Sequence, residues 1–349
     1  MRVLVTGTDG YIGTMLGPVL IERGHEVVGL DTGFYREGWL YNSGIVPRPA
    51  CLNKDIRHID MMDLIGFDAV VHLAELSNDP LGQFNPDITF EINHRGTVEL
   101  ARQCRLAGIS RFLYTSSCSV YGAGADDYCT ERSQTNPQTA YANCKVLVER
   151  DVSAMADDRF SPTFLRNATA YGASPRMRFD LVLNNLAGMA WTTGAINMTS
   201  DGTPWRPLVH VLDICQAIAC ALEAPRDAIH NEIFNVGDSQ ANYRVREVAE
   251  IVTQVFPQCD LHFGKSDGDS RSYRVSFDKI NSRLPGFRCQ HDVMAGAVQL
   301  RDLFATIAMS PELFQSRSYT RLRQLEFLVK TKQLDSHFFW RSAPCRQAA

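Results

Sequence analysis

The sequence predicts an α/β protein built on a doubly wound, parallel β-sheet. Over the first 168 residues, short β-branched runs alternate with longer amphipathic segments. Glycine and polar residues stand where one kind of segment gives way to the next, and a turn with three glycines directly follows the first run. Such alternation is typical of βαβ units, which form parallel sheets covered by helices on both faces.

The individual elements follow in chain order. Apolar, β-branched runs predict strands at 2–7, 26–31, 69–75, 111–117, 162–167 and 231–237. Amphipathic segments predict helices at 11–23, 95–107 and 141–156. After residue 168 the rhythm breaks into loops, and the stretch from about 295 to 341 is expected to be helical and to cover the second lobe. We therefore expect a dinucleotide-binding domain at 1–168, rejoined by 211–237, and a second lobe formed by 169–210 and 238–349.

Composition excludes several classes of protein. The chain has 349 residues and a net charge of −4, and none of its runs of Lys or Arg reaches five, so nucleic acid is not an expected partner. No apolar run approaches the ~20 residues of a membrane-spanning helix, and the first residues do not read as a leader. We expect a cytoplasmic protein without a membrane partner. The ten cysteines show no C-x-x-C spacing, so neither a metal site nor a disulfide framework is expected.

The glycine turn indicates a nucleotide site. Gly7, Gly10 and Gly13 follow the first strand and open the first helix, where a chain can approach a pyrophosphate closely. An ordinary tight turn is the alternative. Asp31 ends the second strand, where a carboxylate accepts hydrogen bonds from a ribose and repels a 2′-phosphate, although it could simply cap the following turn. These residues favour NAD over NADP, with Arg36 as a contrary signal nearby.

Two further patterns are candidates for catalysis. The stretch "TSSCSVYG" at 115–122 places hydroxyls at the carboxyl end of a predicted strand, where they form either a strand cap or part of an active site. Tyr141 and Lys145 are four residues apart and so share one helical face. The ammonium of Lys145, together with an oxidised nicotinamide, is expected to lower the pKa of Tyr141. Such pairs also occur by chance, and it is the glycine turn, the serine-rich end and their order that favour catalysis.

In combination, these motifs resemble the extended short-chain dehydrogenase/reductase family, and in particular its nucleotide-sugar epimerases and dehydratases. The similarity runs from residue 1 to about 290 and includes "TGTDGYIG", "HLAELS", "INHRGT", "TSSCSVYG", "YANCK", "LRNATAYG" and "RPLVHVLD". The resemblance implies a Rossmann-type doubly wound parallel sheet, a smaller C-terminal substrate-binding lobe, NAD as the cofactor and a nucleotide-diphosphate sugar as the substrate. It also implies a homodimer formed through the helices at 95–107 and 141–156.

The resemblance assigns roles position by position. Ser117, Tyr141 and Lys145 match the catalytic residues, with Tyr141 as the base and Lys145 as the residue that holds the nicotinamide ribose. The positions that match cofactor contacts are Gly7, Gly10, Tyr11, Ile12, Gly13, Asp31, Asp55, Ile56, Leu73, Ala74, Asn93, Tyr141 and Lys145. The positions that match substrate contacts are Ser77, Ser119, Thr169, Asn185, Arg206 and Arg271. An arginine fork suits phosphate oxygens, with a surface ion pair as the alternative.

Departures from the family pattern bear on the reaction. Cys118 and Ser119 stand where sugar 4,6-dehydratases carry an Asp-Glu pair, which disfavours dehydration. We expect the Cys118 thiol to be merely packed. Glu75 replaces a usually small residue and either contacts the sugar, acts as an acid or base, or is solvated. The favoured reaction is epimerisation, most simply at C4, through a transient keto-sugar. The alternatives are a 4-ketoreductase or dehydratase of deoxysugar synthesis and a non-catalytic dinucleotide sensor or scaffold.

Overall fold

The computed structural model describes residues 1–42, 47–123, 127–265 and 271–341. Its centre is a seven-stranded sheet in which every pair of neighbours is parallel. In spatial order the strands are β10 (Glu232–Val236), β6 (Ser161–Asn167), β5 (Arg111–Ser117), β4 (Ala69–His72), β1 (Arg2–Thr6), β2 (Glu26–Asp31) and β3 (Ala50–Asn53). This order reverses between β1 and β4, which makes the sheet doubly wound and opens a crevice at that point. The predicted fold class is confirmed.

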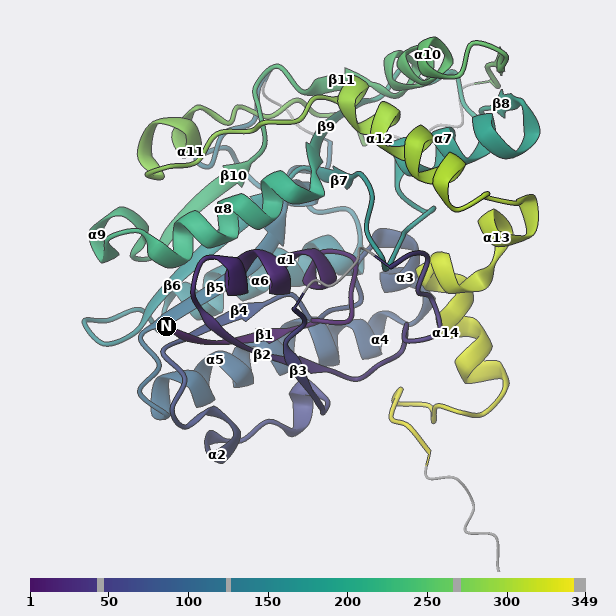
Figure 1. Cartoon of the computed structure of the whole chain (residues 1–349). Helices are drawn as coiled ribbons and strands as arrows, with labels where there is room; N and C mark the ends of the chain where they lie inside the picture. Colours follow the sequence, from purple (N-terminus) through teal and green to yellow (C-terminus); the bar gives the residue numbers. More distant parts are fainter. Residues whose placement is uncertain (43–46, 124–126, 266–270, 342–349) are drawn as a thin grey trace, which may run out of the picture.

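Helices cover both faces of this sheet because alternate strand residues point to opposite sides. Val3 and Val5 pack into a core with α1 (Gly13–Glu22) and α8 (Val211–Glu223), whereas Leu4 packs into a second core on the other face. That second core includes α5 (Thr97–Leu106) and α6 (Ala140–Ser153). Figure 1 shows α1 and α8 on one side of the sheet and α5 on the other.

Short helical elements lie in the connections between the longer helices and strands. They are η1 (Ile56–His58), α2 (Met61–Leu64), α3 (Asp79–Phe84), α4 (Pro86–Thr89), η2 (Phe90–Gly96), η3 (Cys118–Tyr121), α9 (Arg226–Ile229) and α11 (Asp278–Arg283). The six predicted strands are all present. The predicted helix at 95–107 is divided, because its first two residues belong to the π-helical η2 that precedes α5. The edge strand β3 was missed, since its four residues are exposed and show no alternation.

The second lobe has its own core. Helices α7 (Val182–Thr193), α10 (Val245–Val255) and α12 (Val293–Thr306) pack together beside two small sheets. One sheet has the order β11 (Asn242–Arg244), β9 (Trp205–His210) and β7 (Thr169–Tyr171), and the other pairs β12 (Asp260–His262) with β8 (Ala195–Asn197). The sequence did not predict these five strands, which are three to six residues long.

The C-terminal segment differs from the expectation of helices that cover the second lobe. It contains α12, α13 (Pro311–Gln315), η4 (Arg317–Tyr319) and α14 (Arg321–Lys330). α12 packs on the second lobe as expected. Leu325 and Leu328 of α14 instead enter the core of the large sheet, and Figure 1 shows α14 beside α3. Residues 331–341 are not helical, and Lys332 and Phe338 have φ values of 59° and 61°.

Candidate active site

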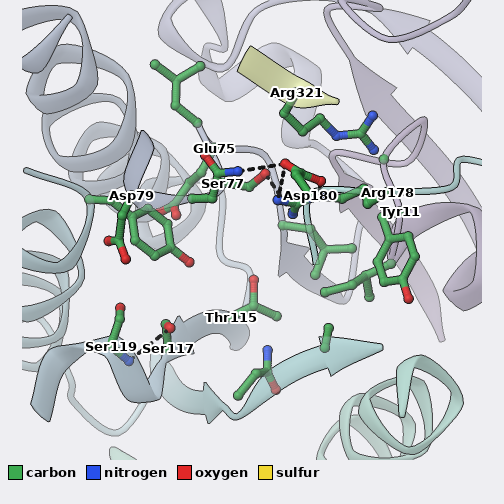
Figure 2. A pocket seen from close by; sticks show the side chains of 18 of the residues that line it. Tyr11, Glu75, Ser77, Asp79, Thr115, Ser117, Ser119, Arg178, Asp180 and Arg321 are labelled. Atoms are coloured by element: carbon green, nitrogen blue, oxygen red, sulfur yellow. Dashed lines mark hydrogen bonds and ion pairs between the residues drawn. The ribbon is translucent and has the colours of Figure 1, made fainter. Parts of the chain in front are cut away.

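A cavity of about 780 Å³ lies at the carboxyl end of the central strands. Its walls come from the loops that follow β1, β2, β4, β5 and β6, from the second lobe, and from α14. All the predicted site residues except Asn93 line it. Figure 2 shows Ser117 and Ser119 at one end of this cavity and Tyr11, Arg178 and Arg321 at the other. The site was predicted at the ends of these strands, where parallel sheets bind ligands.

The glycine turn has the geometry of a pyrophosphate cradle. Gly7 has a φ of 74°, and a Cβ atom there would lie 2.8 Å from the backbone nitrogen of Ala74, so a larger residue does not fit. Helix α1 begins at Gly13, and Ile12 caps it without a side-chain hydrogen bond. The positive end of the helix dipole is thus left for an anion. The place of the turn in the cavity wall favours the nucleotide site over an ordinary tight turn, while its contact with a pyrophosphate stays a prediction.

Asp31 is placed where an adenosine ribose is expected. Its carboxylate accepts hydrogen bonds from the backbone of Gly33 at 2.7 Å and of Asp9 at 3.0 Å. Burial raises the pKa of Asp31. Arg36, the contrary signal for NADP, forms an ion pair with Asp9 at 2.9 Å. The bond from Gly33 shows that Asp31 caps the following turn, as the alternative expected; its place beside the glycine turn also fits NAD, while its contact with a ribose stays a prediction.

The three predicted catalytic residues converge in the cavity. Lys145 is 3% exposed, and its Nζ donates a hydrogen bond to the carbonyl oxygen of Thr115 and lies 5.3 Å from the centroid of the Tyr141 ring. A hydrogen bond with Ser117 is one of the factors that lower the pKa of Tyr141. α6 presents Tyr141 and Lys145 on one face, and Thr139 starts this helix by accepting a hydrogen bond from the backbone of Ala142.

Glu75 is part of this group, so the solvated reading of its side chain is wrong. Its side chain is 3% exposed, forms an ion pair with Lys145, and accepts a hydrogen bond from the Tyr114 hydroxyl at 2.6 Å. A buried ammonium is stabilised by such a partner. The Glu75 carboxylate therefore neutralises the Lys145 ammonium, which was expected to lower the pKa of Tyr141.

The protein groups by themselves do not lower the pKa of Tyr141, contrary to the expectation from the sequence. Burial is the largest influence and raises the pKa of Tyr141 above its usual 10.0. Lys145 lowers this pKa, but Glu75 and Asp79 raise it again. The sequence argument counted the ammonium and the nicotinamide charge and left out both burial and the carboxylate.

Buried polar atoms without protein partners mark the end of the cavity near Ser117. The Oγ of Ser119 and the Oδ1 of Asn167 have no hydrogen-bond partner within the described part of the chain. Ser117 and Asn167 are register partners on β5 and β6. Unsatisfied buried polar atoms are rare in proteins, and a hydroxyl-rich ligand would satisfy these two. The sequence reasoning missed Asn167, which the rule used for Ser117 could have found, since Asn167 also ends a central strand.

The predicted substrate-binding residues line the side of the cavity formed by the second lobe. Arg271 forms an ion pair with Asp79 at 2.7 Å, and Asp79 also accepts a hydrogen bond from the Thr139 hydroxyl. Arg206 donates to the carbonyl oxygen of Trp205 at 2.9 Å. Asn185 donates to the carbonyl oxygen of Phe179, and Thr169 lies on β7. Ser77 and Thr169 line the same cavity, so the structure brings all six positions to its walls.

Asn93 and Cys118, which the sequence analysis also named, lie outside the cavity wall. Asn93 is fully buried, and its amide both accepts a hydrogen bond from the backbone nitrogen of Leu76 and donates one to the backbone oxygen of Leu76. It fixes the loop after β4 and is not placed to touch the cofactor. Cys118 is 1% exposed, and its thiol donates to the carbonyl oxygen of Arg166. This agrees with the expectation that Cys118 is packed.

Some predicted cofactor residues are held by protein partners as well. Asp55 lines the cavity, but its carboxylate forms an ion pair with Arg57 at 2.8 Å. The Tyr11 hydroxyl donates to the carbonyl oxygen of Gly172. Ile56, Leu73 and Ala74 line the cavity with apolar surface. Their place around the cleft suits a dinucleotide, while their contacts with it stay a prediction.

The sequence also missed a charged group at the far end of the cavity. Arg178 forms an ion pair with Asp180 at 2.9 Å and donates to the Ser77 hydroxyl at 3.3 Å, and Arg321 comes from α14. These residues lie in or beyond the irregular stretch after β7, where the sequence shows no motif. Only the folded chain brings them to the cleft.

The comparisons with known proteins agree with the fold and the site. Residues 3–237 match the family described as "NAD dependent epimerase/dehydratase family", and the chain belongs to this family of enzymes, whose cofactor is NAD. A UDP-glucose 4-epimerase from Corynebacterium glutamicum is 30% identical over 271 residues, which cover 73% of this chain and 80% of that protein.

Solved structures give the same picture. MoeE5 in complex with UDP-glucuronic acid and NAD is 25% identical, with a TM-score of 0.76 over 88% of this chain and 99% of that one. The fold is also shared with a dTDP-glucose 4,6-dehydratase from Streptomyces venezuelae, which is 24% identical with a TM-score of 0.77 over 90% of this chain and 100% of that one. The coarse function follows: an NAD-dependent enzyme of the nucleotide-sugar epimerase/dehydratase type. No described helix of the chain is long and apolar enough to cross a membrane.

Proposed function

We propose that this protein is an NAD-dependent nucleotide-sugar epimerase that inverts a carbinol carbon, most simply C4, through a transient keto-sugar. The observation that carries the proposal is the group formed by Ser117, Tyr141 and Lys145 in the cavity, with no carboxylate directly after Ser117. Cys118 faces away from the cavity and Ser119 offers a hydroxyl without a protein partner. Elimination of water needs a further acid and base beside the leaving group, whereas epimerisation needs only the one group that exchanges a proton with the carbinol hydroxyl.

Each residue has a definite task in this reaction. Ser117 and Tyr141 hold the sugar hydroxyl, and Tyr141 accepts its proton when the carbon is oxidised and returns it when the carbon is reduced. Lys145, fixed by Thr115 and Glu75, favours the phenolate. NAD, held by the glycine turn and Asp31, supplies reversible hydride transfer.

We assign the binding of the substrate's diphosphate to residues on the second-lobe side of the cavity. Arg206, Arg271 and Asn185 line the cavity from that side, and guanidinium forks bind phosphate oxygens in pairs. Arg271 is held by Asp79, which orients its fork before the substrate binds. A grip on the nucleotide and diphosphate leaves the sugar free to present either face of the ketone.

The test uses purified protein with a panel of UDP-, GDP-, dTDP- and CDP-sugars in deuterated water. We expect inversion of one carbinol carbon by NMR, without deuterium at C3 or C5 and without a net change of absorbance at 340 nm. Net consumption of added NADH would instead establish the 4-ketoreductase alternative, and a new methyl group together with deuterium at C5 would establish a dehydratase. If no sugar of the panel reacts while NAD binds, the epimerase proposal fails.

The homodimer is part of this proposal. The helices in question are α5 and α6, which pack beside each other on one face of the sheet. Leu106, at the end of α5, is 61% exposed and offers apolar surface to a second copy. Light scattering at micromolar concentration should give twice the chain mass of 39.0 kDa. A monomeric mass would remove this part of the proposal.

A further inference from the structure

Arg321 is a buried cation that lacks an acidic partner of its own. It is the first residue of α14 and is 2% exposed. Its guanidinium lies over the ring of Tyr35 at 4.1 Å and donates one long hydrogen bond of 3.4 Å to the carbonyl oxygen of Arg176. Within the described residues it forms no ion pair. Burial without a paired charge is costly for a guanidinium.

The neighbouring charges do not offset this cost. Asp180 is the nearby carboxylate, but its two oxygens accept from the Nε and Nη2 of Arg178, both at 2.9 Å, and one of them also accepts from Asn78. Burial and the charge of Arg178 lower the pKa of Arg321 to about 10. The group formed by Arg178, Asp180 and Arg321 thus carries one excess positive charge.

This group lies at the end of the cavity that also holds the glycine turn. Arg178 reaches Ser77 in the loop after β4, and Tyr35 belongs to the loop after β2. Figure 2 shows Arg178 next to Tyr11 of the glycine turn after β1, with Arg321 at the same end of the cavity. The Tyr35 hydroxyl is buried and has no hydrogen-bond partner in the described part of the chain, although it also lines the cavity. An anion opposite the glycine turn would meet both unsatisfied groups.

We propose that Arg321 binds the pyrophosphate of NAD, so that α14, which lies beyond the matched family region, completes the cofactor site. The pyrophosphate supplies the missing negative charge, and a guanidinium fork can hold two of its oxygens. Arg321 and the N-terminus of α1 then hold the diphosphate from opposite sides.

The rest of the segment fixes Arg321 over the cleft. Gln324 donates to the carbonyl oxygen of Phe34 at 3.2 Å, and the indole of Trp340 donates to the carbonyl oxygen of Thr32 at 2.6 Å. Arg57 lies over the ring of Phe339 at 3.7 Å. These contacts tie the segment to the loops that surround the adenosine end. We therefore expect these contacts to slow the exchange of the cofactor.

The test measures binding of NAD and of adenosine, which has no phosphate, by calorimetry in the absence of any sugar. Arg321→Gln should weaken NAD binding about 10- to 100-fold, the effect of losing hydrogen bonds to a charged group, and leave adenosine binding unchanged. NAD affinity in Arg321→Gln should also fall less steeply with salt than in the wild type. The matched control is Arg323→Gln, because Arg323 lies on the same helix and is exposed.

Unchanged NAD affinity in Arg321→Gln overturns the proposal, and so does an equal loss of NAD and adenosine affinity, which would indicate a structural role. If Arg321→Gln does not fold, Arg321→Lys decides, since it keeps the charge and loses the fork. A several-fold loss of NAD affinity supports the proposal, and wild-type affinity overturns it. These measurements do not depend on the sugar reaction, so their outcome is separate from that of the proposed epimerase activity.

Discussion

The two ends of the cavity differ in whether their buried positive charges are paired with carboxylates. At the catalytic end, Lys145 is paired with Glu75, and Tyr114 completes the group. At the end near α14, Arg178 is paired with Asp180 while Arg321 keeps an uncompensated charge. A neutral group suits a site where a proton moves back and forth, since a fixed excess charge would favour one protonation state. An uncompensated charge suits a site that holds a permanent anion.

The largest expected effect comes from a substitution that changes the catalytic end alone. Tyr141→Phe removes the group that exchanges a proton with the sugar hydroxyl, so kcat should fall about 10³-fold, within the range for general acid–base catalysis. NAD affinity should change little, because Tyr141→Phe removes one hydroxyl, whereas the other cofactor contacts, including those of Lys145, the glycine turn and the end near α14, remain. Steady-state kinetics with the substrate found by NMR, together with calorimetry for NAD, check both parts. Wild-type turnover in Tyr141→Phe would contradict the assignment of the base.

The second prediction concerns the loss of the carboxylate that pairs with Lys145 at the catalytic end. Glu75→Gln leaves Lys145 as an uncompensated buried cation, which should lower the free energy of unfolding by about 3 kcal/mol. Glu75 raises the pKa of Tyr141, so its removal should lower that pKa. The rising limb of kcat against pH should therefore move to lower pH. Urea unfolding and a pH–rate profile measure the two effects, and a profile that moves to higher pH would contradict the electrostatic role of Glu75.

The third prediction concerns His72, which lies at the end of β4 and is fully buried. Burial first, and then the charge of Lys145, lower the pKa of His72 from 6.5 to about 3. The folded state therefore disfavours protonation, and the unfolded state binds the additional proton between these values. Stability is complete above pH 6.5 and decreases as pH falls toward 3, by about 1.4 kcal/mol for each pH unit within that window.

Urea unfolding at pH 7.0, 5.5 and 4.5 tests this slope. The control is His72→Gln, which removes the titrating ring while keeping polar atoms near its partners Thr6 and Thr97. The variant should lose stability overall and show a shallower dependence on pH. Equal slopes in the two proteins would mean that other groups carry the acid sensitivity.

The sequence predicted the site residues at strand ends and helix starts but not the charged group near α14, for a physical reason. Gly7, Asp31, Ser117 and Tyr141 all lie at strand ends or helix starts, where the alternation of elements determines their place. Arg178 and Arg321 are brought together by tertiary packing of an irregular loop and a late helix, which leaves no periodic signal. Glu75 was noticed as a departure, but whether it is solvated or buried depends on the position of Lys145.

The last and smallest prediction sharpens the role of the C-terminal segment. Trp340→Phe keeps an aromatic ring near Phe34 but removes the indole N–H that donates to the carbonyl oxygen of Thr32. One hydrogen bond at a partly exposed position contributes about 1 kcal/mol, so stability should fall by no more than that. If the segment must move for the cofactor to leave, NAD should dissociate several-fold faster in this variant, while its association rate stays the same. Stopped-flow fluorescence with NADH as the probe measures both rates, and an unchanged dissociation rate would show that residues 331–340 do not hold α14 over the cleft.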